Sequence, residues 1–464
     1  MRLIVSSLII KKNIFYLIVQ LSLMLMIIKV LQLPMGVKIM GAFFVVSLSL
    51  ISLFNFYFTF NFLLLLIFLP YLTIVHQAVI FSVILFISCK VNSDERKISL
   101  RSNDIWVALV LFFLSSLPSI INTPEKLLSF RDMLNLVALI LVFYATLNGI
   151  KKIKYIKSGL LFFIAAVFLH SIWVIYLGAG SSKRVFGILG VYFIDFAGLA
   201  ALVSFIFFIY SCGGKRLLYG LLFLVNTLGL VFTQTRNAWL SFGISFITLI
   251  IFLVFNDRKY KIKKHLVITM VAFFLVISAA IFILFVNKEG NRVVGKSQEV
   301  VLTNDPESVG LNSFVSRLFI WHTAIVAYTQ HPILGIGAYA FKHVSQNYYT
   351  IPRGFYDIYV EGRTPHVAFL QVLTETGIIG LFFFLNFIIK VFKKSLRSIK
   401  HIQLEENIVP TLAINWSLFY IIFSMMMTES WLYGQYIVWF GILLGFQENN
   451  YNLLKSQTKH GEVE

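Results

Sequence analysis

One histidine and four arginines combine a residue type suited to catalysis with an informative position. His366 directly follows a proline that is expected to mark the start of a helix, and an imidazole is the side chain best suited to accept a proton near neutral pH. The arginines are Arg184, Arg236, Arg317 and Arg363. A guanidinium group is permanently charged and can bind two phosphate oxygens at once. Together these residues could supply a general base and a binding site for a diphosphate.

Each of these residues also has a simpler interpretation. An arginine near the end of a membrane span often only extends its charged group toward water, and a single histidine at such a position is usually structural. Arg236 lies in a tight turn, Thr233-Gln-Thr-Arg236-Asn-Ala238, with no acidic residue nearby in the sequence. A bound anion would neutralise it. Four arginines near one predicted face of the protein are harder to explain as four independent side chains that each only extend toward water.

The composition indicates that lipid surrounds these residues. Hydrophobic residues make up 59% of the 464 residues and charged residues only 13%, which is too few for a water-solvated surface. Apolar runs recur, for example at 160–177, 238–255 and 266–286, and each can cross a hydrocarbon layer about 30 Å thick as a helix. Backbone groups in lipid must be hydrogen-bonded internally. The sequence therefore predicts an all-α integral membrane protein.

The net charge of +19 arises from lysines and arginines that gather in alternate connections. These basic connections lie at 90–101, 151–157, 215–216, 258–264 and 390–400. Such an excess marks the cytoplasmic side of a membrane protein. It also accounts for the charge without nucleic-acid binding, which we do not expect. Because basic residues stand near both termini, we expect both in the cytoplasm and the protein in the inner membrane of a bacterium.

The alternation of apolar runs and basic connections predicts 12 to 14 transmembrane helices in one polytopic domain, residues 1–464. The helix number depends on whether 37–90 holds one crossing or three. The other spans are expected near 14–33, 104–121, 133–150, 159–177, 191–211, 217–233, 238–256, 266–286, 367–389, 408–428 and 435–447.

One external connection, 287–365, is far longer than the rest, and a connection of that length is usually functional. Within it, the stretch 314–328 has apolar residues at helical spacing, which predicts an amphipathic helix at the membrane interface. The segment His331-Pro-Ile-Leu-Gly-Ile-Gly337 is expected to end that helix. No acidic, histidine or cysteine residues have the spacing of metal ligands, so we expect no metal and no other cofactor.

Three segments in this half of the chain resemble the O-antigen ligase and O-antigen polymerase superfamily. The family's histidine signature is His, an amide or Ser, nine residues and Gly-x-x-Gly, and here His366 is followed at that spacing by Gly377 and Gly380. The turn around Arg236 resembles the family's arginine turn, and 316–337 resembles the helix of its external loop. The resemblance covers roughly 180–390. Val367 departs from the pattern, because it stands where the amide or Ser is usual.

The resemblance implies a membrane glycosyltransferase that takes a glycan from undecaprenyl diphosphate on the outer face of the membrane. His366 would deprotonate an acceptor hydroxyl, and the arginines, Arg236 and Arg317 foremost, would stabilise the departing diphosphate. One displacement would invert the anomeric configuration. The acceptor would be a second glycan, in a polymerase, or the lipid A core, in a ligase. We favour the polymerase because it needs no outer-membrane acceptor, and a transporter of the same lipid remains the third alternative.

Overall fold

The computed structural model describes residues 103–178, 193–256, 313–427 and 436–461, except residue 403, together with residue 185 and a few residues between 60 and 85. Throughout this part of the chain the regular elements are helices and no strand is found. The predicted fold class, an all-α integral membrane protein, is confirmed. Arg184, the predicted spans at 14–33 and 266–286 and most of 37–90 lie outside the described residues.

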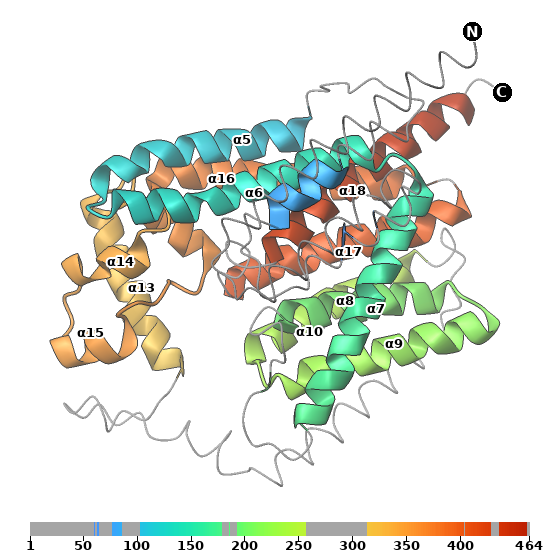
Figure 1. Ribbon diagram of the computed structural model, residues 1–464, viewed down its shortest axis with the longest axis horizontal. Helices are drawn as coiled ribbons and strands as arrows, with labels where there is room; N and C mark the ends of the chain where they lie inside the picture. The colour runs from blue at the N-terminus through green and yellow to red at the C-terminus, as the bar shows by residue number, and fades with distance from the viewer. Residues whose placement is uncertain are drawn as a thin grey trace, which may run out of the picture.

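The helices form one bundle with a smaller group of helices at one end (Figure 1). Their bounds are α5 Asp104–Ser116, continued by the 3-10 helix η2 Leu117–Asn122, then α6 Lys126–Gly149, α7 Ile153–Gly178, α8 Phe193–Ile209, α9 Gly213–Phe232, α10 Arg236–Phe255, α13 Ser313–Gln330, α14 Phe341–Val344, η5 Ser345–Asn347, α15 Arg353–Tyr359, α16 Ala368–Lys400, α17 Glu405–Met427 and α18 Tyr436–Gly461.

Seven of the described helices are long and apolar enough to cross a membrane. They are α5 with η2, α6, α7, α9, α10, α16 and α17. Helix α8 is shorter, and its surface is buried along nearly its whole length, because it is apolar on every side and other helices surround it. These helices coincide with spans predicted from the sequence, which makes the chain a multi-pass membrane protein.

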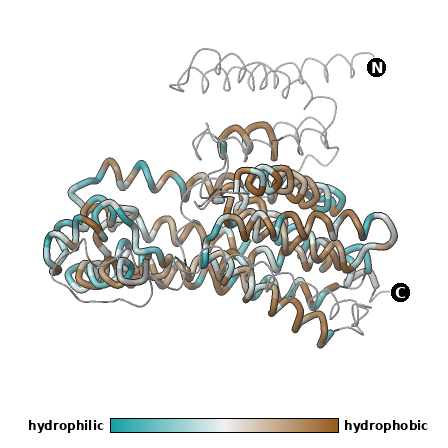
Figure 2. Tube along the Cα trace, turned by 90° about the horizontal axis from the view of Figure 1, so that it is seen from below, coloured by the Kyte–Doolittle hydropathy of each residue, from teal (hydrophilic) through white to brown (hydrophobic). Residues whose placement is uncertain are grey.

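The connections between helices fall at two opposite ends of the bundle (Figure 1). Helices α13, α14 and α15 gather at one end, beside the connection between α5 and α6 and the start of α16. We call this the loop end. The connections from α6 to α7, from α8 to α9 and from α16 to α17 lie at the other end, which we call the basic end after its lysines. Hydrophobic residues line the helices between the two ends (Figure 2).

The group at the loop end has a hydrophobic core of its own. Helix α13 contributes Ile320, Ala324 and Ala327, which pack with buried aromatic residues of the following segment such as Phe341 and Tyr359. The helix predicted over 314–328 is therefore confirmed. The apolar stripe expected on that helix faces outward, since Leu318 and Ile325 are 46% and 52% exposed. The small alanines form the packed face because they allow the aromatic rings to approach the helix closely.

Helix α16 is broken at Gly377, where the backbone adopts φ 66° and ψ −168°. The span predicted over 367–389 lies within α16, and the break at Gly377 is a feature that the sequence did not predict. A break leaves helical carbonyl and N–H groups without their usual partners. The segment that follows α13 supplies new ones: the N–H groups of Ile336 and Gly337 donate to the carbonyls of Thr374 and Glu375, at 3.1 and 3.0 Å.

Candidate active site

Helix α13 brings the site residues together because its first turns contact both the turn before α16 and the start of α10. The indole N–H of Trp321 on α13 donates a hydrogen bond to the carbonyl of Pro365, 2.9 Å away, and so holds the turn that leads to His366. One turn earlier, Arg317 donates to the side chain of Asn237 at the start of α10, 3.4 Å away. The same helix therefore lies beside both the histidine signature and the arginine turn.

His366 is half-buried and stands immediately before α16, whose N-cap is Val367. Its backbone is in the left-handed region, with φ 56°. That conformation costs of order 1–3 kcal/mol in a residue other than glycine, so the surrounding structure must impose it. The buried residues Thr364 and Pro365 and the hydrogen bond from Trp321 provide that constraint.

Two further residues share this strained conformation. Among the described residues, the left-handed region is occupied outside glycine only by Gln234, Tyr339 and His366. Gln234 lies in the turn before Arg236, and Tyr339 lies just after the His331–Gly337 segment. Strained backbone clusters at functional sites, where it presents side chains that a relaxed turn would not. Strain thus occurs in or directly beside each of the three segments that resemble the superfamily.

Arg236 is the first residue of α10, and its side chain is exposed. The turn before it is held by the indole of Trp239, which donates to the carbonyl of Leu230 at 3.0 Å. The next residue, Asn237, donates to the carbonyl of Met427 at the end of α17, 3.2 Å away. These contacts fix the first turn of α10, so that Arg236 projects from a rigid helix end whose dipole also favours an anion.

Arg363 has partners within the protein. Its guanidinium donates to the hydroxyl of Ser316 at 2.7 Å and to the carbonyl of Ile358 at 2.9 Å. Ser316 directly precedes Arg317 on α13. Arg317 therefore projects from this helix, and Arg363 is hydrogen-bonded to the neighbouring position of the same helix. Arg184 is outside the described residues. The structure therefore connects Arg236, Arg317, Arg363 and His366 through α13.

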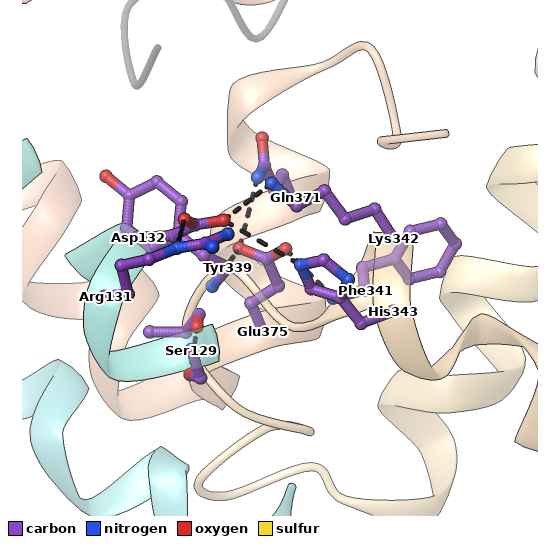
Figure 3. A network of polar contacts seen from close by, with 10 residues as sticks. Ser129, Arg131, Asp132, Tyr339, Phe341, Lys342, His343, Gln371 and Glu375 are labelled. Atoms are coloured by element: carbon purple, nitrogen blue, oxygen red, sulfur yellow. Dashed lines mark hydrogen bonds and ion pairs between the residues drawn. The ribbon is translucent and has the colours of Figure 1, made fainter. Parts of the chain in front are cut away.

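Sequence reasoning missed a second polar network at the loop end (Figure 3). Lys342 of α14 forms an ion pair with Asp132 of α6, with 2.6 Å between nitrogen and oxygen, and His343 lies 3.8 Å from the same carboxylate. Glu375 of α16 lies in the same view and is 3% exposed. The signal available in the sequence was Asp132 in the apolar helix α6, since ionisable residues next to lipid usually have a functional role. Among the described residues, no three His, Cys, Asp or Glu side chains gather as metal ligands would.

A known protein family matches the part of the chain that carries these residues. No curated protein matches the chain. Residues 220–385 match the family described as O-antigen ligase. The matched range lies within the predicted range 180–390, and it contains Arg236, Arg317, Arg363, His366 and the break at Gly377. This match confirms, over residues 220–385, the resemblance to the O-antigen ligase and polymerase superfamily that was inferred from the sequence.

Proposed function

We propose that this membrane enzyme is a polymerase of surface polysaccharide, such as O-antigen, capsule or exopolysaccharide. Its donor is a glycan linked to undecaprenyl diphosphate, and its acceptor is the end of a second such glycan. The reaction takes place at the loop end, on the outer face of the bacterial inner membrane, with both chain termini in the cytoplasm. The enzyme uses neither a nucleotide sugar nor a metal ion.

The observation that carries this proposal is the placement of Arg317 and Trp321 on one face of α13. Trp321 holds the turn that carries His366, and Arg317 reaches the start of α10, where Arg236 projects. A candidate base and candidate phosphate ligands therefore share one rigid support. Transfer from a diphosphate needs this arrangement, because the base must act on the attacking hydroxyl while the phosphate ligands act on the leaving group at the other side of the anomeric carbon.

In the proposed reaction, His366 takes the proton of an acceptor hydroxyl, and the hydroxyl oxygen attacks the anomeric carbon of the donor sugar. The bond between that carbon and the diphosphate oxygen breaks, and undecaprenyl diphosphate leaves with the electron pair. Arg236 and Arg317, together with Arg184 and Arg363, balance the charge that develops on the leaving group. Attack opposite the leaving group inverts the anomeric carbon. His366 then releases its proton to solvent.

The outward apolar side chains of α13 fit the lipid part of such a donor. Leu318 and Ile325 are exposed on either side of Trp321 and lie on the same helix as Arg317. An amphiphilic substrate needs cationic and apolar groups next to each other at the height of the lipid headgroups. The polyprenyl chain would lie against this stripe while its diphosphate meets the arginines.

A ligase is the second candidate, because the matching family is described as O-antigen ligase. In a ligase the acceptor is the lipid A core, and every residue named above keeps its role. A transporter of the same lipid would need its charged groups along a central path, whereas Arg317 and Arg363 lie on or against α13 at the loop end, and Arg236 begins the helix that Arg317 contacts. Membrane lipids surround the protein in every case.

Deletion of the gene separates these functions when surface polysaccharide is analysed on a gel. Loss of the polymerase leaves single repeat units attached to the core, or abolishes capsule chains in an organism that has no core. Loss of the ligase leaves the core unsubstituted while lipid-linked polymer accumulates. The polymerase proposal is contradicted if long chains persist on the lipid carrier in the deletion strain.

A further inference from the structure

The segment 332–341 joins α13 to α14 and packs against the break in α16; we call it the linking segment. It lies between the helix that carries Arg317 and the helix that begins beside His366. Its glycine at 335 approaches α16 so closely that a Cβ atom there would be 2.4 Å from the backbone carbonyl oxygen of Glu375. Only a residue without a side chain fits at such a contact.

Glu375 fixes this segment through both of its carboxylate oxygens. Oε2 accepts a hydrogen bond from the backbone N–H of Tyr339 at 2.9 Å, and Oε1 accepts one from the backbone N–H of Phe341 at 3.3 Å. The side-chain amide of Gln371, one turn earlier on α16, donates to Oε2 at 3.2 Å (Figure 3). A carboxylate that is 3% exposed needs such partners, because burial without them is costly.

The backbone of the linking segment completes the broken helix. Besides the two bonds from Ile336 and Gly337, the N–H of Ile378 donates to the carbonyl of Pro332 at 3.0 Å. Further along, the hydroxyl of Thr374 donates to the carbonyl of Ala324 on α13 at 3.2 Å. Helix α16 is thus bonded to α13 before the break and to the linking segment after it.

The opposite side of the linking segment is held by η2 and α6. Ser119 accepts a hydrogen bond from the N–H of Ala338 at 2.9 Å, and Ser129 donates to the carbonyl of the same residue. The side chain of Asn122 donates to the carbonyl of Gly335 at 2.8 Å. The segment is therefore fixed between two elements, and the carboxylate of Glu375 is the contact that ties its strained residue, Tyr339, to α16.

We propose that Glu375 is a positioning residue: its carboxylate fixes α13, and with it Arg317, relative to the start of α16 beside His366. It is not a catalytic residue, because it lies seven residues beyond the start of α16, which is roughly 10 Å along a helix axis. Its catalytic consequence depends on the proposed function, while its effect on the placement of α13 does not.

A carboxylate suits this role because the two N–H groups need two separate acceptors. Glutamine at 375 would keep one acceptor oxygen and turn an NH2 group toward the second N–H, so Glu375→Gln should release one side of the contact. Glu375→Asp keeps both oxygens but withdraws them by one methylene. Glu406→Gln is the matched control, since Glu406 is an exposed glutamate at the basic end.

The test measures the distance between α13 and α16 with spin labels at Ile325 and Phe382, whose side chains are 52% and 65% exposed. Both native cysteines, Cys89 and Cys212, are first replaced by serine. We expect one narrow distance distribution in the unmodified background and in Glu406→Gln, a broad or shifted one in Glu375→Gln, and a smaller change in Glu375→Asp.

Kinetics of the same purified variants add the catalytic consequence. We expect kcat to fall about 10- to 100-fold in Glu375→Gln, because small displacements of reacting groups have effects of that size. The KM for the lipid-linked donor should change by less than about threefold, and Glu375→Asp should recover part of kcat. If the unmodified protein forms no glycan, the proposed function fails while the distance measurement still decides the placement.

Unchanged distance distributions in both Glu375 variants would overturn the inference, and so would a wild-type kcat in an active preparation of Glu375→Gln. Should Glu375→Gln fail to fold, Glu375→Asp decides the outcome by the same distance measurement.

Discussion

Arg317 on α13 donates a hydrogen bond to the side-chain oxygen of Asn237, which lies 3.4 Å away and 80 residues earlier in the chain. This contact joins the external helix to the turn that carries Arg236. It places the two arginine-bearing segments at one end of the bundle, beside the turn before His366.

Replacing Arg236 or Arg317 with lysine keeps the positive charge but removes the forked pair of donors. A charge-assisted hydrogen bond to phosphate contributes about 1.5–3 kcal/mol, so transfer should fall roughly 10- to 100-fold in each variant while expression is unchanged. Arg353→Lys is the control, because Arg353 also lies at the loop end and its side chain is 82% exposed. Full activity in both lysine variants would mean that these arginines only extend their charges toward water.

Replacing Gly377 with alanine should destabilise the protein strongly. The residue has φ 66°, and a Cβ atom would lie 2.2 Å from the carbonyl oxygen of Ile333. Strain of this kind costs about 1–3 kcal/mol before the clash is counted. Gly243→Ala is the matched control, because Gly243 is in the middle of α10 with no atom within 4 Å of a Cβ. There alanine should be neutral or stabilise by about 0.5–1 kcal/mol. Unfolding midpoints in detergent compare the two, and equal midpoints would contradict the role of the break.

The pH dependence of stability should contain a contribution from His343. Burial, and then the positive charge of Lys342, lower the pKa of this imidazole below its ordinary value near 6.5. The unfolded chain therefore binds the proton at a higher pH than the folded protein does. The contribution of His343 to stability is fully present above pH 6.5 and is lost as the pH falls from there through the lower folded-state pKa. His343→Gln should lose less stability between pH 7 and pH 5, and parallel curves for the two proteins would refute this.

The proposed orientation predicts which thiols a membrane-impermeant maleimide reaches in intact spheroplasts. Cys212 is exposed at the basic end and should stay unlabelled until the membrane is opened. A cysteine introduced at the exposed position Gln346, in a background that lacks Cys89 and Cys212, should react at once. The reverse pattern would place the site on the cytoplasmic face and remove the argument for a lipid-linked donor.

Much of the helical framework could be predicted from the sequence because it depends on local signals. Apolar runs between basic connections predicted α9, α10 and α17 within a few residues, and helical spacing predicted α13. The family signature indicated His366 and Arg236 from residue order and spacing alone. These features need no knowledge of distant contacts.

Other parts of the site could not be predicted because their partners are far apart in the sequence. The break at Gly377 is stable only with the backbone of 332–337 beside it, and a pattern within 367–389 does not contain that partner. Lys342 and Asp132 are 210 residues apart, so their pairing has no local signal. The contact of Arg363 with Ser316 likewise depends on how the loop end folds.

The central claim is tested most directly by transfer with purified components. Wild-type protein and His366→Ala are each given undecaprenyl-diphosphate-linked repeat units, with a chelator present and no nucleotide. We predict that wild type forms longer glycans and that His366→Ala forms them about 100- to 10,000-fold more slowly while still binding the donor, because a sugar hydroxyl is a poor nucleophile without a base. No new glycosidic bond with wild type, or a wild-type rate with His366→Ala, would contradict the account.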